Sequence, residues 1–190
     1  MDLLLTIVVL IWVPLIPMRL VLHGGIGLWR RFGDLAYVIS AVYWCSIDIL
    51  LVANRDVWMS APWRFQTFPL ASILGFAPLF FGLGFGYWAA STLGFVAFST
   101  RPQLSPKKSP STLIIAGPYR IVRHPFYFSE WFILLGALMI SHSWLVFGLT
   151  LLTLILDPLI TQFEEKELVA RFGKSYEDYR KKVPRLLPRR

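Results

Sequence analysis

The sequence predicts an all-α membrane protein with about five transmembrane helices, ending in a helical hairpin and a cytosolic amphipathic helix. Of the 190 residues, 56% are apolar and 16% are charged, whereas soluble domains average about 25% charged residues. The apolar residues gather in charge-free stretches of about 20, the length of helix that crosses a bilayer core. The net charge of +8 lies outside most of these stretches. We therefore expect a membrane bilayer as partner and no nucleic acid, because nucleic-acid binders spread positive charge over a polar surface.

Three candidate spans fall in the first hundred residues, at 3–18, 35–53 and 68–90. The first span carries no charge and extends to Leu22 if Arg19 snorkels toward the headgroups. Asp48 interrupts the second span. A buried acid there either marks a functional site or pairs with an interior arginine, and the sequence leaves both interpretations open.

The last two spans form a hairpin over residues 126–163, interrupted at residues 141–143 by Ser-His-Ser. Each helix has about 17 residues, near the lower limit for crossing a bilayer. Asp157 and Pro158 then predict a kink or a restart of the helix. The amphipathic helix that follows ends at Gly173, because glycine commonly terminates helices.

The positions of lysine and arginine predict the orientation. With the C-terminus in the cytosol, 17 of the 19 lysines and arginines lie on the cytosolic side, and Arg55 and Arg64 lie on the other. Short cytosolic loops are enriched in these residues. We therefore expect the two termini on opposite sides of the membrane.

The third span contains glycines at positions 82, 84 and 86. Small residues four apart let a neighbouring helix approach closely, so Gly82 and Gly86 predict helix packing. Dinucleotide binding does not explain them, because Tyr87 occupies the place of the last glycine of that motif.

Polar residues gather before the hairpin, in the segment Ala-Gly-Pro-Tyr-Arg-Ile-Val-Arg-His-Pro-Phe-Tyr at residues 116–127. Pro125 can begin a helix, since its missing amide is unpaired there anyway. Arg123 and His124 then lie at a helix N-terminus, a place that favours anionic groups. A snorkelling arginine within a belt of interfacial aromatic residues is the simpler alternative.

A second polar group follows the hairpin and contains Glu164, Glu165 and Glu167. At 100° per residue, Asp157 and Glu164 share one helix face and Glu165 points elsewhere. These acids form either a solvated helix end or a carboxylate held over a ligand.

Together these segments resemble the isoprenylcysteine carboxyl methyltransferase family and its prokaryotic relatives, which are also similar to phospholipid methyltransferases. The resemblance covers roughly residues 104–188 and rests on ordered residues: Gly117, Tyr119, Arg123, His124, Pro125, Phe126, Tyr127, Glu164, Glu165, Phe172, Gly173, Tyr176, Tyr179 and the segment 183–188. It implies methyl transfer from S-adenosylmethionine to a lipid-like or small amphiphilic acceptor. Because the dense polar segments lie in the last half of the chain, we expect residues 1–100 to form a three-helix transmembrane scaffold. Residues 101–190 then form one integrated domain of cofactor-binding loop, hairpin and C-terminal helix.

By this resemblance a set of residues binds the cofactor: Ser111, Thr112, Leu113, Ile114, Gly117, Tyr119, His124, Pro125, Phe126, Tyr127, Glu164 and Glu165. Two positions depart from the family. Ser111 stands where the family commonly has histidine. Ile160 stands where the carboxyl methyltransferases have an arginine near the substrate carboxylate, which argues against a carboxylate acceptor because a buried carboxylate needs a paired cation.

We expect His124, Glu130 and Arg123 to take part in catalysis. An amine or thiol acceptor loses a proton, which His124, Glu130 or Asp48 could accept. Glu130 lies one turn into the fourth helix, where an unpaired acid is costly, so we expect it to face the pocket.

Two other classes of function compete. Membrane reductases of sterols and isoprenoids are similar in their Arg, His and Tyr arrangement but bind NADPH, and the Glu164–Glu165 pair argues against them. A non-enzymatic membrane scaffold is the third class. We expect no metal, because His23, His124 and His142 lie in different loops without ligand spacing.

Overall fold

The computed structural model describes residues 2–60, 64–66, 68, 70–94, 104 and 112–189, and these residues form helices and loops. The helices are α1 (Asp2–Gly24), α2 (Ile26–Phe32), α3 (Leu35–Ala53), α4 (Arg55–Met59), α5 (Leu70–Leu93), α8 (Pro125–Ser141), α9 (Trp144–Phe172) and α10 (Lys174–Lys182), with a short 3-10 helix η2 (Gly117–Arg120). The expected all-helical fold is confirmed.

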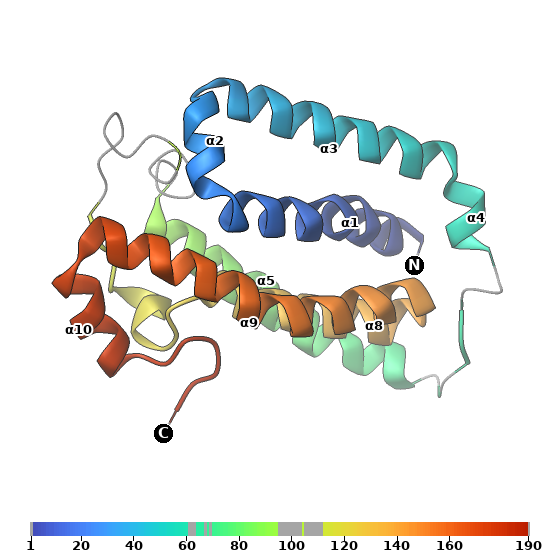
Figure 1. Ribbon diagram of the computed structural model, residues 1–190. Coiled ribbons are helices and arrows are strands. Elements are labelled where there is room, and N and C mark those ends of the chain that lie inside the picture. Colours follow the sequence, from blue (N-terminus) through green and yellow to red (C-terminus); the bar gives the residue numbers. More distant parts are fainter. Residues whose placement is uncertain are drawn as a thin grey trace.

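Four of these helices, α1, α3, α5 and α9, are long and apolar enough to cross a membrane, and α8 is a shorter apolar helix of 17 residues. The backbone of a span in hydrocarbon must satisfy its own hydrogen bonds, and a helix does so. The second span has the predicted bounds, and the third begins two residues later than predicted. The expected helices are therefore present, with α2 and α4 as short additions at their ends (Figure 1).

The helices pack around α8, α9, α5 and α1 (Figure 1). The most extensive contact joins α5 to α8, and α1 lies against α9. Leu5, Val9, Leu134 and Val146 meet in the main apolar core. The second span, α3, packs against α1 and is largely exposed along its length, as expected for a helix that faces lipid.

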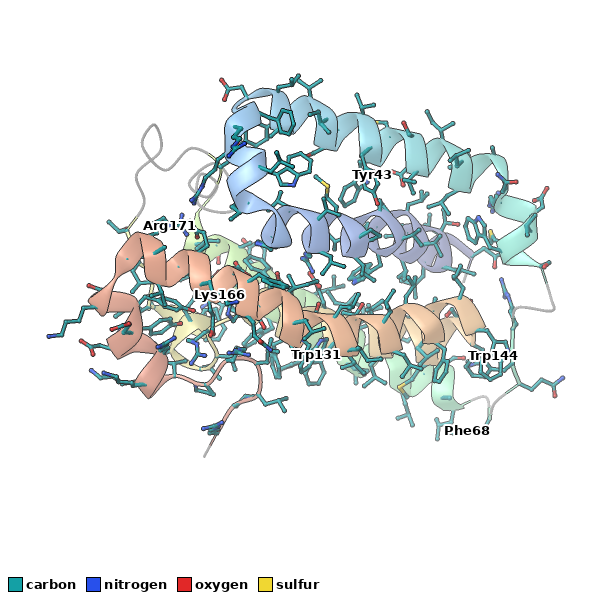
Figure 2. All side chains as sticks on the ribbon, in the orientation of Figure 1. Tyr43, Phe68, Trp131, Trp144, Lys166 and Arg171 are labelled. Carbon is teal, nitrogen blue, oxygen red and sulfur yellow. The ribbon has the colours of Figure 1, made fainter. Side chains whose placement is uncertain are left out.

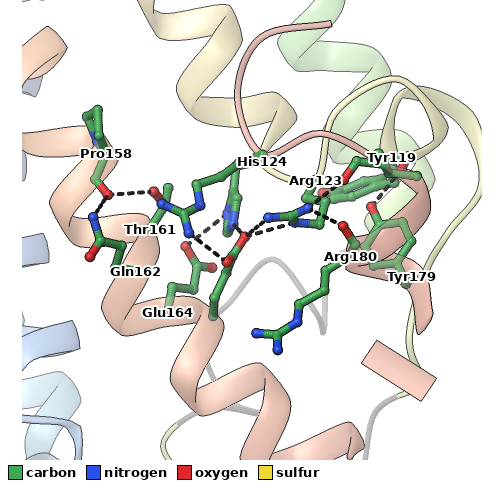
Figure 3. Close-up of polar contacts among 12 residues, drawn as sticks. Tyr119, Arg123, His124, Pro158, Thr161, Gln162, Glu164, Tyr179 and Arg180 are labelled. Carbon is green, nitrogen blue, oxygen red and sulfur yellow. Dashed lines mark hydrogen bonds and ion pairs between the residues drawn. The ribbon is translucent and has the colours of Figure 1, made fainter. Parts of the chain in front are cut away.

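Helix α9 corrects one prediction. It continues through Asp157 and Pro158 to Phe172, so the helix does not restart there. The Thr161 hydroxyl donates to the carbonyl of Asp157 at 2.8 Å. Figure 3 shows the Gln162 amide donating to the carbonyl of Pro158 at 3.1 Å. Side chains of this kind help membrane helices to tolerate proline. Gly173, with φ of 55°, ends the helix as predicted.

The two ends of the bundle differ. Figure 1 shows α2, η2 and α10 at one end and α4 with the N-terminus at the other. The turn between α8 and α9 belongs to the N-terminal end, where His142 lies 3.2 Å from the Ser72 hydroxyl. His124 lies at the opposite end of α8, just before Pro125. The two histidines are thus separated as expected.

Candidate functional site

The Arg-His-Pro turn is built by η2 and the start of α8. Gly117 has a φ of 54°, and a side chain there would lie 2.7 Å from the Thr92 hydroxyl of α5. Only glycine adopts this conformation readily, and the chain then enters η2. The Tyr179 hydroxyl donates to the Tyr119 carbonyl at 2.6 Å, which joins α10 to η2 (Figure 3). Pro125 begins α8 as predicted.

The C-terminal tail pairs with the same turn. The amides of Arg123 and His124 donate to the carbonyls of Pro184 and Arg185 at 2.9 and 3.1 Å. Leu186 is buried next to this contact. Residues 184–186 therefore support the turn. The sequence motif includes these residues, whereas the positive charge of the tail gives no hint of this contact.

Arg123 is held entirely by the protein. Its Nε and Nη2 donate to Glu165 Oε1 at 2.8 and 2.6 Å. Its Nη1 donates to the carbonyls of Arg180 and Val183 at 2.8 and 2.5 Å. Charge-assisted hydrogen bonds of this kind are the strong ones. Arg123 therefore fixes the turn, α9 and the tail relative to one another.

His124 lies between two carboxylates (Figure 3). Its Nδ1 is 3.4 Å from Glu164 Oε2, and its Nε2 is 3.3 Å from Glu165 Oε1. Burial by itself lowers the pKa of a histidine, but the Glu164 and Glu165 carboxylates outweigh burial and raise the pKa of His124. Both ring nitrogens thus face carboxylates.

A pocket opens between the turn, α9 and α10, with about 750 Å³ of empty space including open solvent. Most of the residues that the sequence predicts for the cofactor line it: Thr112, Leu113, Ile114, Tyr119, His124, Pro125, Phe126, Tyr127 and Glu164. Arg123, predicted to take part in catalysis, lines it as well.

Other predicted residues have different positions. Ser111 lies outside the described residues. Gly117 shapes the turn behind the pocket rather than lining it. Glu165 is absent from the described pocket lining and faces Arg123, His124 and Arg185. The helix periodicity predicted that it points elsewhere than Glu164, which does line the pocket.

Glu130 is absent from the described pocket lining and pairs with Arg19 of α1. Two hydrogen bonds of 2.5 and 2.6 Å join the side chains, and the Arg19 guanidinium lies 4.7 Å from the Tyr127 ring centroid. The prediction that Arg19 snorkels to the headgroups is therefore wrong, because the carboxylate draws it into the bundle. Asp48 Oδ1 is buried and accepts no hydrogen bond from any described residue.

Sequence reasoning missed part of the lining, namely Leu93, Leu168, Arg171, Phe172, Tyr176 and Tyr179. A signal was available for α9, because Leu168 and Arg171 follow Glu164 at intervals of four and three and so share its helix face. The position of Leu93 depends on the packing of α5 against η2, which local sequence does not reveal.

Two buried polar atoms in the pocket suit a ligand. The Tyr176 hydroxyl is buried and has no hydrogen-bond partner among the described residues. Glu164 Oε2 is buried as well and lies 3.4 Å from His124 Nδ1. An unsatisfied buried polar group is costly and calls for an explanation, such as a missing ligand. Beside them, Tyr119 and Tyr127 supply aromatic faces. The set fits S-adenosylmethionine, which offers amino and hydroxyl donors and a sulfonium cation. The described residues contain no group of three histidine, cysteine or acidic side chains that could hold a metal.

Comparisons with known proteins identify the family of the chain. The family profile for phospholipid methyltransferase matches residues 70–175, more than half of the chain. The chain is 32% identical over 169 residues to methanethiol S-methyltransferase of Pseudomonas deceptionensis, covering 84% of this chain and 63% of that protein. It is 41% identical over 71 residues to methanethiol S-methyltransferase 2 of Bradyrhizobium diazoefficiens, covering 37% of this chain and 27% of that protein.

A further relative is protein-S-isoprenylcysteine O-methyltransferase of Schizosaccharomyces pombe. It is 38% identical over 87 residues, covering 44% of this chain and 36% of that protein. The chain thus covers less than two thirds of the length of each of these relatives. The profile match spans α5 to the start of α10 and so contains the turn, the hairpin and the acidic face of α9. The chain belongs to the phospholipid methyltransferase family.

Proposed function

We propose that this protein is a membrane methyltransferase that uses S-adenosylmethionine and acts on a lipid-like or small amphiphilic acceptor. One observation carries the proposal: the Arg-His-Pro turn and the acidic face of α9 enclose a single pocket. These two segments are 40 residues apart in sequence, from His124 to Glu164. The family and the names of the relatives support the same chemistry.

The donor is held by groups of complementary character. Glu164 would accept hydrogen bonds from the amino group or the ribose hydroxyls of S-adenosylmethionine. The Tyr176 hydroxyl would form a hydrogen bond with the same ligand. Tyr119 and Tyr127 line the pocket, and their aromatic faces would attract the sulfonium cation of a bound donor. When bound, S-adenosylmethionine supplies an activated methyl group, so the protein needs no covalent nucleophile.

The protein contributes alignment and exclusion of water. Holding two reactants in line is worth about 7–11 kcal/mol where the geometry is well set. His124 has both ring nitrogens beside carboxylates, and these raise its pKa. It therefore acts in this mechanism as a positioning group that fixes Glu164, rather than as the base.

The residues near the pocket favour a thiol, an amine or another lipid-like group as the methyl acceptor over a carboxylate. Ile160 is buried next to Tyr127, at the position where the carboxyl methyltransferases have an arginine. An apolar side chain leaves an acceptor carboxylate without a cation. The relatives named as methanethiol S-methyltransferases are consistent with a thiol.

The pocket faces the cytosol in this proposal. It lies at the end of the bundle that carries α2 and α10 (Figure 1), and this end bears most of the lysines and arginines of the loops. The positive-inside bias assigns such an end to the cytosol. The acceptor then enters from the lipid, and the donor enters from water.

The test is calorimetry of the detergent-solubilised protein with S-adenosylhomocysteine and, separately, with NADPH. We expect S-adenosylhomocysteine to bind and NADPH not to bind. The reverse result identifies a reductase and contradicts the proposal. Incubation of membranes with methyl-labelled donor then identifies the acceptor. The variants His124→Ala and Glu164→Ala should abolish labelling, whereas a membrane scaffold tolerates both.

A further inference from the structure

We propose that Arg171 binds the carboxylate at the amino-acid end of S-adenosylmethionine. The inference rests on the proposed function and adds a residue outside the motif that identifies the family. Arg171 lines the pocket near the end of α9 (Figure 2). A guanidinium can form two parallel hydrogen bonds with a carboxylate, which makes arginine well suited to this task.

Arg123 is a poorer candidate, although it also lines the pocket. All three of its guanidinium nitrogens donate to protein groups, namely Glu165 and the carbonyls of Arg180 and Val183. A ligand carboxylate would have to displace these bonds and release the tail. Arg123 therefore has a structural role, because it joins the turn to α9 and to the C-terminal segment.

His124 is also a poorer candidate, because a carboxylate lies beside each of its ring nitrogens. Glu164 is 3.4 Å from Nδ1, and Glu165 is 3.3 Å from Nε2. A third carboxylate at this ring would meet two like charges in a buried setting, where repulsion is strong. The ligand carboxylate is therefore expected at another cation.

Arg171 has the electrostatic setting that an anion requires. It shares Glu167 with Arg30 of α2: Arg30 Nη2 lies 2.6 Å from Glu167 Oε1, and Arg171 Nη2 lies 3.4 Å from Glu167 Oε2. Two guanidinium groups and the Glu167 carboxylate thus lie together beside the pocket. The Arg171 guanidinium also lies 4.7 Å from the Phe172 ring centroid, a contact that orients its plane.

The acid and the cation that would contact the ligand lie at different positions along one face of α9. Glu164, Leu168 and Arg171 all line the pocket from one side of the helix. Seven residues of helix separate the first from the last, a rise of about 10 Å. The acid can therefore meet hydrogen-bond donors of the ligand, while Arg171 meets the carboxylate farther along.

Comparing the binding of two ligands tests the Arg171 contact independently of the rest of the site. S-adenosylhomocysteine carries the amino-acid end, and methylthioadenosine has the same adenosine and thioether sulfur without it. We expect Arg171→Gln to lower the ratio of the two affinities by about tenfold to a hundredfold, with methylthioadenosine binding unchanged. Lys174→Gln, a change of an exposed cation three residues away, is the matched control and should keep the wild-type ratio.

The outcomes are distinct. If Arg171→Gln keeps the wild-type ratio, the carboxylate binds elsewhere, for example at main-chain amides of residues 112–114, and the inference is overturned. Equal losses for both ligands indicate a structural role and overturn it as well. Arg171→Lys keeps the charge without the guanidinium fork and should give an intermediate ratio, which tests the inference even if the glutamine variant does not fold. If the wild type binds neither ligand, the proposed function itself fails.

Discussion

At the scale of single residues, the charge of His124 depends on its neighbours rather than on its own burial. Glu164 and Glu165 are adjacent in sequence and about 100° apart on α9, yet both lie beside the imidazole. His124 can receive both because it lies between the turn and the helix as they pack together. The sequence revealed the three residue types but not their contact.

A pH dependence of stability follows from this contact. The pKa of His124 is raised in the folded protein, and an unfolded histidine titrates near about 6.5. The stabilisation is therefore complete below that pH and is lost as pH rises through the folded-state pKa. We expect the Tm of the wild type in detergent to fall as the pH rises above about 6.5, and that of His124→Gln to fall less. Parallel curves for the two proteins would contradict the assignment of the charge.

At the scale of elements, glycines determine how closely α5 and α8 pack. A side-chain carbon at Gly82 would lie 2.7 Å from the Ser129 carbonyl oxygen, and one at Gly86 would lie 3.0 Å from the Ser129 hydroxyl. The predicted role of these two glycines is thus confirmed. Gly75 and Gly136 form a second close approach on the same pair of helices, with a side-chain carbon at Gly136 only 2.6 Å from the Gly75 carbonyl oxygen.

The same helix supplies a matched pair of variants. Gly82→Ala should lower the free energy of unfolding by about 1–3 kcal/mol, because the added methyl group meets the α8 backbone. Gly84→Ala adds the same methyl group where nothing lies within 4 Å, and it should be neutral or stabilising by up to about 1 kcal/mol, since alanine favours the helix. Thermal unfolding in detergent measures both. Equal effects would show that this packing does not limit stability.

At the scale of the whole molecule, Arg19 and Glu130 join the first helix to the fourth apolar helix. Their side chains are 20% and 11% exposed, and the ion pair lies against Tyr127, which lines the pocket. Similarly, Arg30 and Glu167 join α2 to α9. The predicted scaffold of residues 1–100 thus contacts the second part of the chain through buried charges, while the domain division itself stays a prediction.

A double-mutant cycle tests the ion pair. Glu130→Gln leaves a buried arginine unpaired and should cost about 3–5 kcal/mol of unfolding free energy, and Arg19→Met should cost a similar amount. The double variant should recover much of the loss, because it leaves no charge behind. Additive losses would contradict the pair. Full methyl transfer by the double variant at every pH would also remove Glu130 as the proton acceptor.

The sequence alone determined the apolar helices and their approximate bounds, the start of α8 at Pro125 and the end of α9 at Gly173. It also indicated most of the pocket residues, because the motif is local and ordered. These features follow from hydropathy, backbone restrictions and short-range spacing, which act along the chain.

Only the tertiary structure decided the partners of the charged groups. Arg19 lies 111 residues from Glu130, and Arg30 lies 137 residues from Glu167. The arrangement of Glu165 with three cations, the continuity of α9 through Pro158 and the position of Arg171 in the pocket likewise depend on packing. A buried charge is stabilised by whichever opposite charge the fold brings within a few ångströms, and sequence spacing does not report that distance.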